Sequence, residues 1–113
     1  ALRLLSLPLT VTAMAEMAAV EVLKHHDELL DAVAITKAQR DRVAHELGAE
    51  QSYGNFVWLP RGDAAEVEQK ILDEGVVIRR YLDEGVRVSI TNEEETTQFL
   101  EAWQRAGIKP WTA

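Results

Sequence analysis

The 113-residue chain contains no cysteine, which excludes disulfide bonds and thiol catalysis. None of its apolar runs approaches the ~20 residues that a membrane-spanning helix needs. It has no Gly-rich phosphate loop and no dinucleotide-binding fingerprint. It begins with Ala1 rather than methionine, and its opening stretch resembles a signal peptide only weakly. We therefore expect a processed or excised piece of a cytoplasmic protein.

Basic residues are in the minority: 12 Lys and Arg stand against 19 Asp and Glu, for a net charge of -7. This balance argues against a nucleic acid or an anionic membrane surface as partner. A small anionic ligand stays open, because it responds to nearby arginines more than to the overall charge. The hydrophobic share of 47% and the charged share of 27% are ordinary for a soluble globular domain.

Two helices are predicted in the first part of the chain. Thr10 or Thr12 can cap the first, over residues 14–26. The second is expected over residues 27–47, with Gly48 as its C-terminal stop. Its apolar positions are expected to share one side; they are Leu29, Leu30, Val33, Ala34, Val43, Ala44 and Leu47.

The second part of the chain alternates strands and helices. Strands are expected over 55–59, 76–81 and 86–90, and a helix over 63–72. A last helix is expected to start at Asn92 and to be ended by Gly107 and Pro110. Asp63 and Asn92 each precede a glutamate by three residues, the spacing of a capping box. The fold class is therefore α+β, with N-terminal helices leading into a small three-stranded, mostly antiparallel sheet backed by helices. We expect a helical connector over 1–48 and a small domain over 49–113.

A right-handed crossover between the first two strands leaves room for the third strand between them, antiparallel to both. Arg87 would then lie on the central strand, and Arg79 at the end of its neighbour. A guanidinium in a β-branched strand is costly to bury unless it meets an anion, because it cannot lose its proton. Its planar fork binds a carboxylate or phosphate through two parallel hydrogen bonds. The two arginines therefore predict an anion-binding edge.

Taken in order, several segments resemble the C-terminal, small-domain part of fold-type I pyridoxal-phosphate aminotransferases of the histidinol-phosphate and aromatic amino acid subgroup. These segments are Leu7-Pro8, His26-Asp27-Glu28, Arg40–Val43, Tyr53–Pro60, Gly75–Arg79 and Gly85–Ile90. The resemblance implies that Arg87 holds the substrate α-carboxylate and that Arg79 assists with a side-chain phosphate or carboxylate. Asn55 is a further candidate for contact with the ligand.

The same resemblance implies an enzyme of amino-acid biosynthesis that uses pyridoxal phosphate and acts as a homodimer on amino-acid and 2-oxo-acid substrates. Such enzymes hold the cofactor on a lysine in a Ser-x-x-Lys-like segment of the large domain. The lysines here are Lys24, Lys37, Lys70 and Lys109, and none has that context. We therefore expect a fragment that lacks its large domain, holds no cofactor and does not transaminate alone. Thr91 and Arg80 depart from the family pattern and leave the pocket's details open.

Simpler interpretations compete with these. Arg79 and Arg87 could pair with Asp83 or Glu84 in the turn between them, and Asn55 could be only a turn residue. The histidines match no zinc-site spacing, so no metal site is predicted. Trp58 and Trp103 fit core positions better than an aromatic pocket. The whole chain could also be a freestanding module that binds amino acids or regulates another protein.

Overall fold

The computed structural model describes residues 10–111, so Leu7-Pro8 lies outside the described residues. The chain divides into two units between Ala32 and Val33. Over the described residues, no helix is both long and apolar enough to cross a membrane.

The N-terminal unit is helical and contains α2, Ala13–Leu23, and the start of α3, His26–Leu47. Thr12 caps α2, because its hydroxyl oxygen accepts a hydrogen bond from the Ala15 N–H at 3.2 Å. Of the two predicted caps, Thr12 is therefore confirmed. No residue of α2 is buried, although the helix carries large apolar side chains.

Of the residues of α3, only those in its last turns contribute to the core of the C-terminal unit. Val43 and Ala44 are buried, and Leu47 packs against them. The apolar residues of the earlier turns are not buried, since Leu29 and Leu30 are exposed. Helical spacing predicted apolar residues on both the earlier and the later turns of α3. Only the later turns, however, pack against core residues.

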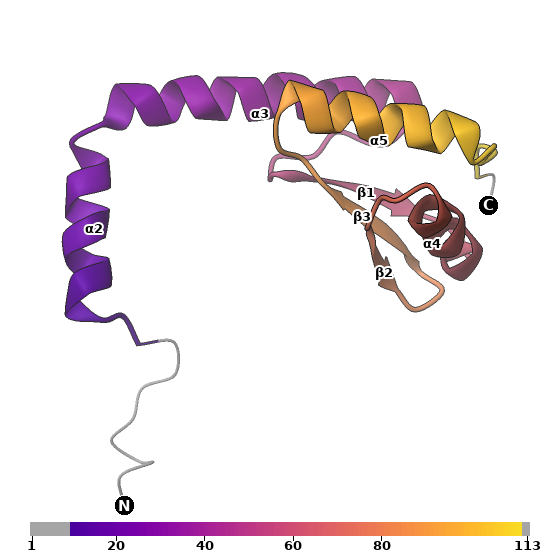
Figure 1. Cartoon of the computed structure of the whole chain (residues 1–113), viewed down its shortest axis with the longest axis horizontal. Helices are drawn as coiled ribbons and strands as arrows, with labels where there is room; N and C mark the ends of the chain where they lie inside the picture. The colour runs from indigo at the N-terminus through magenta and orange to yellow at the C-terminus, as the bar shows by residue number, and fades with distance from the viewer. Residues whose placement is uncertain (1–9, 112–113) are drawn as a thin grey trace, which may run out of the picture. The chain divides into compact units, whose positions relative to one another are not determined.

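The sheet has the predicted order. Its strands are β1 (Phe56–Pro60), β2 (Arg79–Tyr81) and β3 (Gly85–Ser89), arranged β1-β3-β2 with both pairings antiparallel. Along β1 and β3, alternate residues are buried, namely Val57, Leu59, Val86 and Val88. They form one core with the last part of α3, with α4 (Ala64–Asp73) and with α5 (Glu93–Arg105). Helices therefore back one face of the sheet (Figure 1).

Strand β2 is shorter than predicted, because the residues before it serve the end of α4. Gly75 has a positive φ of 83°, and the Val76 N–H donates to the Ile71 carbonyl at 3.1 Å. This is the hydrogen bond of a Schellman cap, which satisfies a terminal helix carbonyl. Ile78 then enters the core, and strand pairing begins only at Arg79.

The two predicted capping boxes have different outcomes. Asn92 caps α5, since its Oδ1 accepts from the Glu95 N–H at 2.9 Å. Asp63 makes no side-chain cap on α4, and that prediction is wrong. Its carboxylate instead accepts from Arg61, with Nε–Oδ1 at 2.6 Å and Nη2–Oδ2 at 2.9 Å. Arg61 is buried, and leaving a buried guanidinium without a counter-charge costs more free energy than leaving a helix end uncapped.

Candidate functional site

Arg79 and Arg87 lie on the face of the sheet that the helices leave uncovered. Val86 and Val88 point into the core, so Arg87 between them points to the opposite face. In the strand register, Trp58 and Arg79 are the two direct neighbours of Arg87 across the sheet. Directly opposed residues share a face, so these three side chains form one row.

Aromatic rings surround the two guanidinium groups in this row. The Cζ atom of Arg87 is 5.8 Å from the ring centroid of Phe56 and 5.7 Å from that of Tyr81. The Cζ atom of Arg79 is 5.4 Å from the Tyr81 ring, and Trp58 meets Tyr81 edge-on with centroids 5.7 Å apart. We call these five residues the arginine face.

Neither arginine of this face has an acidic partner among the described residues. The Nε of the half-buried Arg87 is shielded from solvent and has no hydrogen-bond partner there. By contrast, four other arginines have a carboxylate oxygen within 3.0 Å, and they are Arg40, Arg61, Arg80 and Arg105. The structure therefore does not contain the simple pairing of Arg79 or Arg87 with Asp83 or Glu84. A shielded, unsatisfied guanidinium N–H is costly.

The side chain of Arg80 lies on the opposite face of the sheet from those of Arg79 and Arg87. It is opposite Val86 in the register, and therefore on the side of the helices. Its Nε donates to Glu68 of α4 at 2.9 Å. Arg80 thus links β2 to α4 and takes no part in the arginine face.

Asn55, the third candidate from the sequence, directly precedes β1. Its carbonyl accepts from the Ile90 N–H at 2.7 Å and extends the β1–β3 pairing by one step. Within the described part of the chain, no side-chain hydrogen bond joins it to either arginine. The structure therefore brings Arg79 and Arg87 together and leaves Asn55 at the margin.

Sequence reasoning missed the aromatic members of the face. Trp58 was expected in the core, but it is half-buried on the opposite side of the sheet from Val57 and Leu59. Strict alternation along β1 could have indicated this, whereas the approach of Tyr81 depends on the strand register. Trp103 does pack against the core, as predicted.

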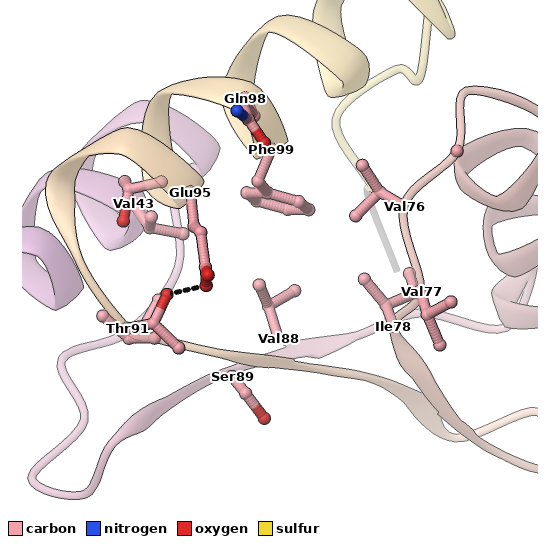
Figure 2. Close-up of a pocket in the computed structure, with 13 residues that line it drawn as sticks. Val43, Val76, Val77, Ile78, Val88, Ser89, Thr91, Glu95, Gln98 and Phe99 are labelled. Atoms are coloured by element: carbon pink, nitrogen blue, oxygen red, sulfur yellow. Dashed lines mark hydrogen bonds between the residues drawn. The ribbon is translucent and has the colours of Figure 1, made fainter.

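A cavity of about 390 Å³ lies elsewhere, between α5 and the residues that precede β2 (Figure 2). Its lining includes Val43, Ile78, Val88 and Phe99, which are core residues, and neither arginine lines it. At its rim the Thr91 hydroxyl donates to the Glu95 carboxylate, as the dashed line in Figure 2 shows. The cavity is therefore separate from the arginine face.

All four lysines of the chain lie outside the sheet. Lys24 is paired with Glu21 at 3.0 Å, and Lys70 with Glu66 at 2.6 Å. The arginine face offers cations and rings, which suit the recognition of an anion rather than the attachment of a carbonyl compound.

Comparison with known proteins shows which sequences this chain is similar to. No family model matches the sequence. An aromatic amino acid aminotransferase of Corynebacterium glutamicum (strain ATCC 13032) is 42% identical over 104 residues, covering 92% of this chain and 30% of the relative. A histidinol-phosphate aminotransferase of Streptomyces avermitilis is 42% identical over 112 residues, covering 90% of this chain and 30% of the relative. This chain is homologous to the C-terminal part of these aminotransferases.

The fold agrees with this relationship. A crystal structure from Burkholderia pseudomallei K96243, provisionally described as an aminotransferase, superposes with a TM-score of 0.65 at 27% identity. The match covers 78% of this chain and 31% of that one. The chain thus spans about 30% of the length of its aminotransferase relatives, and the resemblance predicted from its motifs is confirmed. The division into a connector over 1–48 and a small domain over 49–113 stays a prediction.

Proposed function

We propose that this chain is the C-terminal, substrate-binding part of an aminotransferase. The parent enzyme exchanges an amino group between a 2-amino acid and a 2-oxo acid with pyridoxal phosphate. One observation carries the proposal: in a chain homologous to aminotransferases, Arg87 lies on an uncovered sheet face with a shielded Nε and no acidic partner among residues 10–111.

Arg87 binds the substrate α-carboxylate in this proposal. Its fork can donate two parallel hydrogen bonds to a carboxylate, which fixes the carboxylate plane as well as its position. Holding the carboxylate also fixes the direction of the substrate Cα–H bond, and correct orientation is a large part of catalysis. The cofactor, when bound, supplies the electron sink for the reaction. In this proposal the rest of the parent enzyme holds that cofactor.

Arg79 binds a second anionic group, such as a side-chain phosphate or carboxylate. It is exposed, opposes Arg87 in the register and shares the Tyr81 ring with it. Two neighbouring guanidinium groups with no acidic partner favour a ligand with more than one negative charge. Asn55 is a weaker candidate for contact with the ligand.

The rest of the parent enzyme covers the N-terminal unit, and the parent is a homodimer. Met14 is 82% exposed and Met17 is 73% exposed, on a helix without one buried residue. Exposed apolar side chains grouped on one helix are typical of an interface. The relatives are about three times as long as this chain, so a large covering part is expected.

Amino-group transfer, measured with and without the rest of the parent enzyme, tests this proposal. We expect no transfer from the 113-residue chain mixed with cofactor, an aromatic 2-amino acid and a 2-oxo acid. We expect turnover when the full-length protein that contains it is assayed with the same substrates. Transamination by the chain alone, or a full-length protein inactive toward aromatic 2-amino acids and histidinol phosphate, would contradict the proposal.

A further inference from the structure

Two aromatic rings on the arginine face are unusually open to solvent for their size. Phe56 is 36% exposed and Tyr81 is 37% exposed, and both lie next to the same guanidinium group. The Cζ atom of Arg87 is almost equally far from the two ring centroids, at 5.8 Å and 5.7 Å. The rings belong to the two outer strands, and Arg87 belongs to the strand between them.

This placement restricts Arg87 without occupying its hydrogen-bonding atoms. An arginine side chain is long and has many rotamers, so an unrestrained guanidinium would have to be ordered when a ligand binds. A carboxylate neighbour would order it but would also compete with the ligand. An aromatic ring attracts the cation through its π face and uses none of the N–H groups.

From this geometry we infer that Phe56 and Tyr81 are positioning residues for Arg87. They hold its guanidinium between two rings, so that its N–H groups stay free for a carboxylate. The inference rests on the proposed role of Arg87 in substrate binding. Tyr81 also borders Arg79, and it therefore positions both cations of the site.

A purely structural role for Tyr81 makes a different prediction. Tyr81 meets Trp58 edge-on, so its loss could also loosen the sheet. A structural role predicts lower thermal stability with unchanged mobility of Arg87 in the folded protein. A positioning role predicts a more mobile Arg87 side chain even where the fold is intact.

The first experiment measures the ¹⁵N relaxation of the Arg87 Nε–H group in the 113-residue chain. Tyr81→Leu keeps apolar volume but removes the ring, and we expect it to lower the order of this bond vector. Tyr81→Phe keeps the ring and should restore the order. Phe56→Leu removes the other ring without touching the Trp58–Tyr81 contact, and it provides the test if Tyr81→Leu fails to fold. Trp111→Leu is the matched control, because it removes a ring 6.0 Å from a different arginine, Arg61.

The second experiment measures kcat and KM in the full-length enzyme. We expect Tyr81→Leu and Phe56→Leu each to raise KM for a carboxylate substrate by about 3- to 10-fold, with a smaller change in kcat. Tyr81→Phe and Trp111→Leu should leave KM within about twofold of the parent value. Unchanged Arg87 order and unchanged KM in both ring-to-leucine variants would overturn the inference. If Arg87→Ala is damaging in that same enzyme, only the positioning role fails, whereas a harmless Arg87→Ala would overturn the proposed function itself.

Discussion

At the scale of single residues, the surroundings of each arginine indicate what it does. Arg61 is buried and meets Asp63 through two hydrogen bonds, so its charge is already balanced within the fold. Arg87 is half-buried and meets two rings instead, which leaves its charge available. The sequence predicted Arg79 and Arg87 as anion-binding residues. It could not predict which arginines are paired with a carboxylate, because pairing depends on the face of the sheet on which each side chain lies.

Replacing Arg79 should affect substrates selectively. Arg79→Ala removes a cation that we assign to the second anionic group of the substrate. In the full-length enzyme we expect kcat/KM to fall by about 10-fold or more for substrates with an anionic side chain. Substrates with a neutral side chain should change by less than about threefold. Steady-state kinetics with one substrate of each kind checks this, and an equal loss for both would contradict the assignment.

The Arg61–Asp63 pair should make the fold sensitive to acid. The hydrogen bond from Arg61 lowers the pKa of the Asp63 carboxyl from its ordinary value of 3.8. A folded-state pKa below the unfolded-state value adds stability above the unfolded pKa, and this stability is lost as the pH falls through the folded pKa. Asp63→Asn should therefore lower the free energy of unfolding by about 1 to 3 kcal/mol at pH 7.

Thermal unfolding of both proteins between pH 7 and pH 2 measures this effect. The difference in Tm between the original protein and Asp63→Asn should be largest near neutral pH. It should shrink below about pH 4, where this aspartate begins to take up a proton in the unfolded chain, and it should be lost as the pH falls through the lower folded-state pKa. A difference that stays constant down to pH 2 would show that the carboxylate charge is not responsible.

At the scale of elements, the strand order and two of the helix caps could be predicted from the sequence. The handedness of the crossover predicted β3 at the centre of the sheet. The caps Thr12 and Asn92 could be predicted because each forms a hydrogen bond within four residues of itself. The length of β2 could not be predicted, because the same apolar residues suit a strand and the Schellman cap of α4. The aromatic part of the arginine face also needed the register, which couples residues more than 20 positions apart.

Gly85 lets β1 and β3 pack closely together beside the arginine face. A Cβ atom at this position would lie 2.5 Å from the Leu59 carbonyl oxygen and 2.6 Å from the Trp58 ring. Gly85→Ala should therefore separate β1 from β3 and displace Trp58, lowering stability by about 1 to 3 kcal/mol. Chemical denaturation measures the loss. Gly62→Ala is a suitable control, because its nearest neighbour is the Trp111 side chain at 3.3 Å, and equal losses in the two variants would contradict the account.

At the scale of the whole molecule, we propose that the rest of the parent enzyme covers α2, a helix with no buried residue. The double variant Met14→Glu/Met17→Glu should leave the thermal stability of the chain alone nearly unchanged and reduce its binding of a hydrophobic dye. In the full-length enzyme it should weaken assembly, because two charges would enter an apolar interface. Sedimentation and dye binding report both effects, with Glu16→Gln as the exposed control on the same helix. Normal assembly of the double variant would show that α2 is not an interface.

We propose that Arg87 binds the substrate carboxylate, and this role can be measured from the kinetics of both half-reactions in the full-length enzyme. Arg87→Ala should lower kcat/KM by about 10- to 100-fold or more with the amino-acid and the 2-oxo-acid substrate alike, because both carry the same carboxylate. Arg80→Ala, on the opposite side of the sheet, should leave both half-reactions close to their original rates. If Arg87→Ala left both half-reactions intact, Arg87 would not be the carboxylate-binding residue.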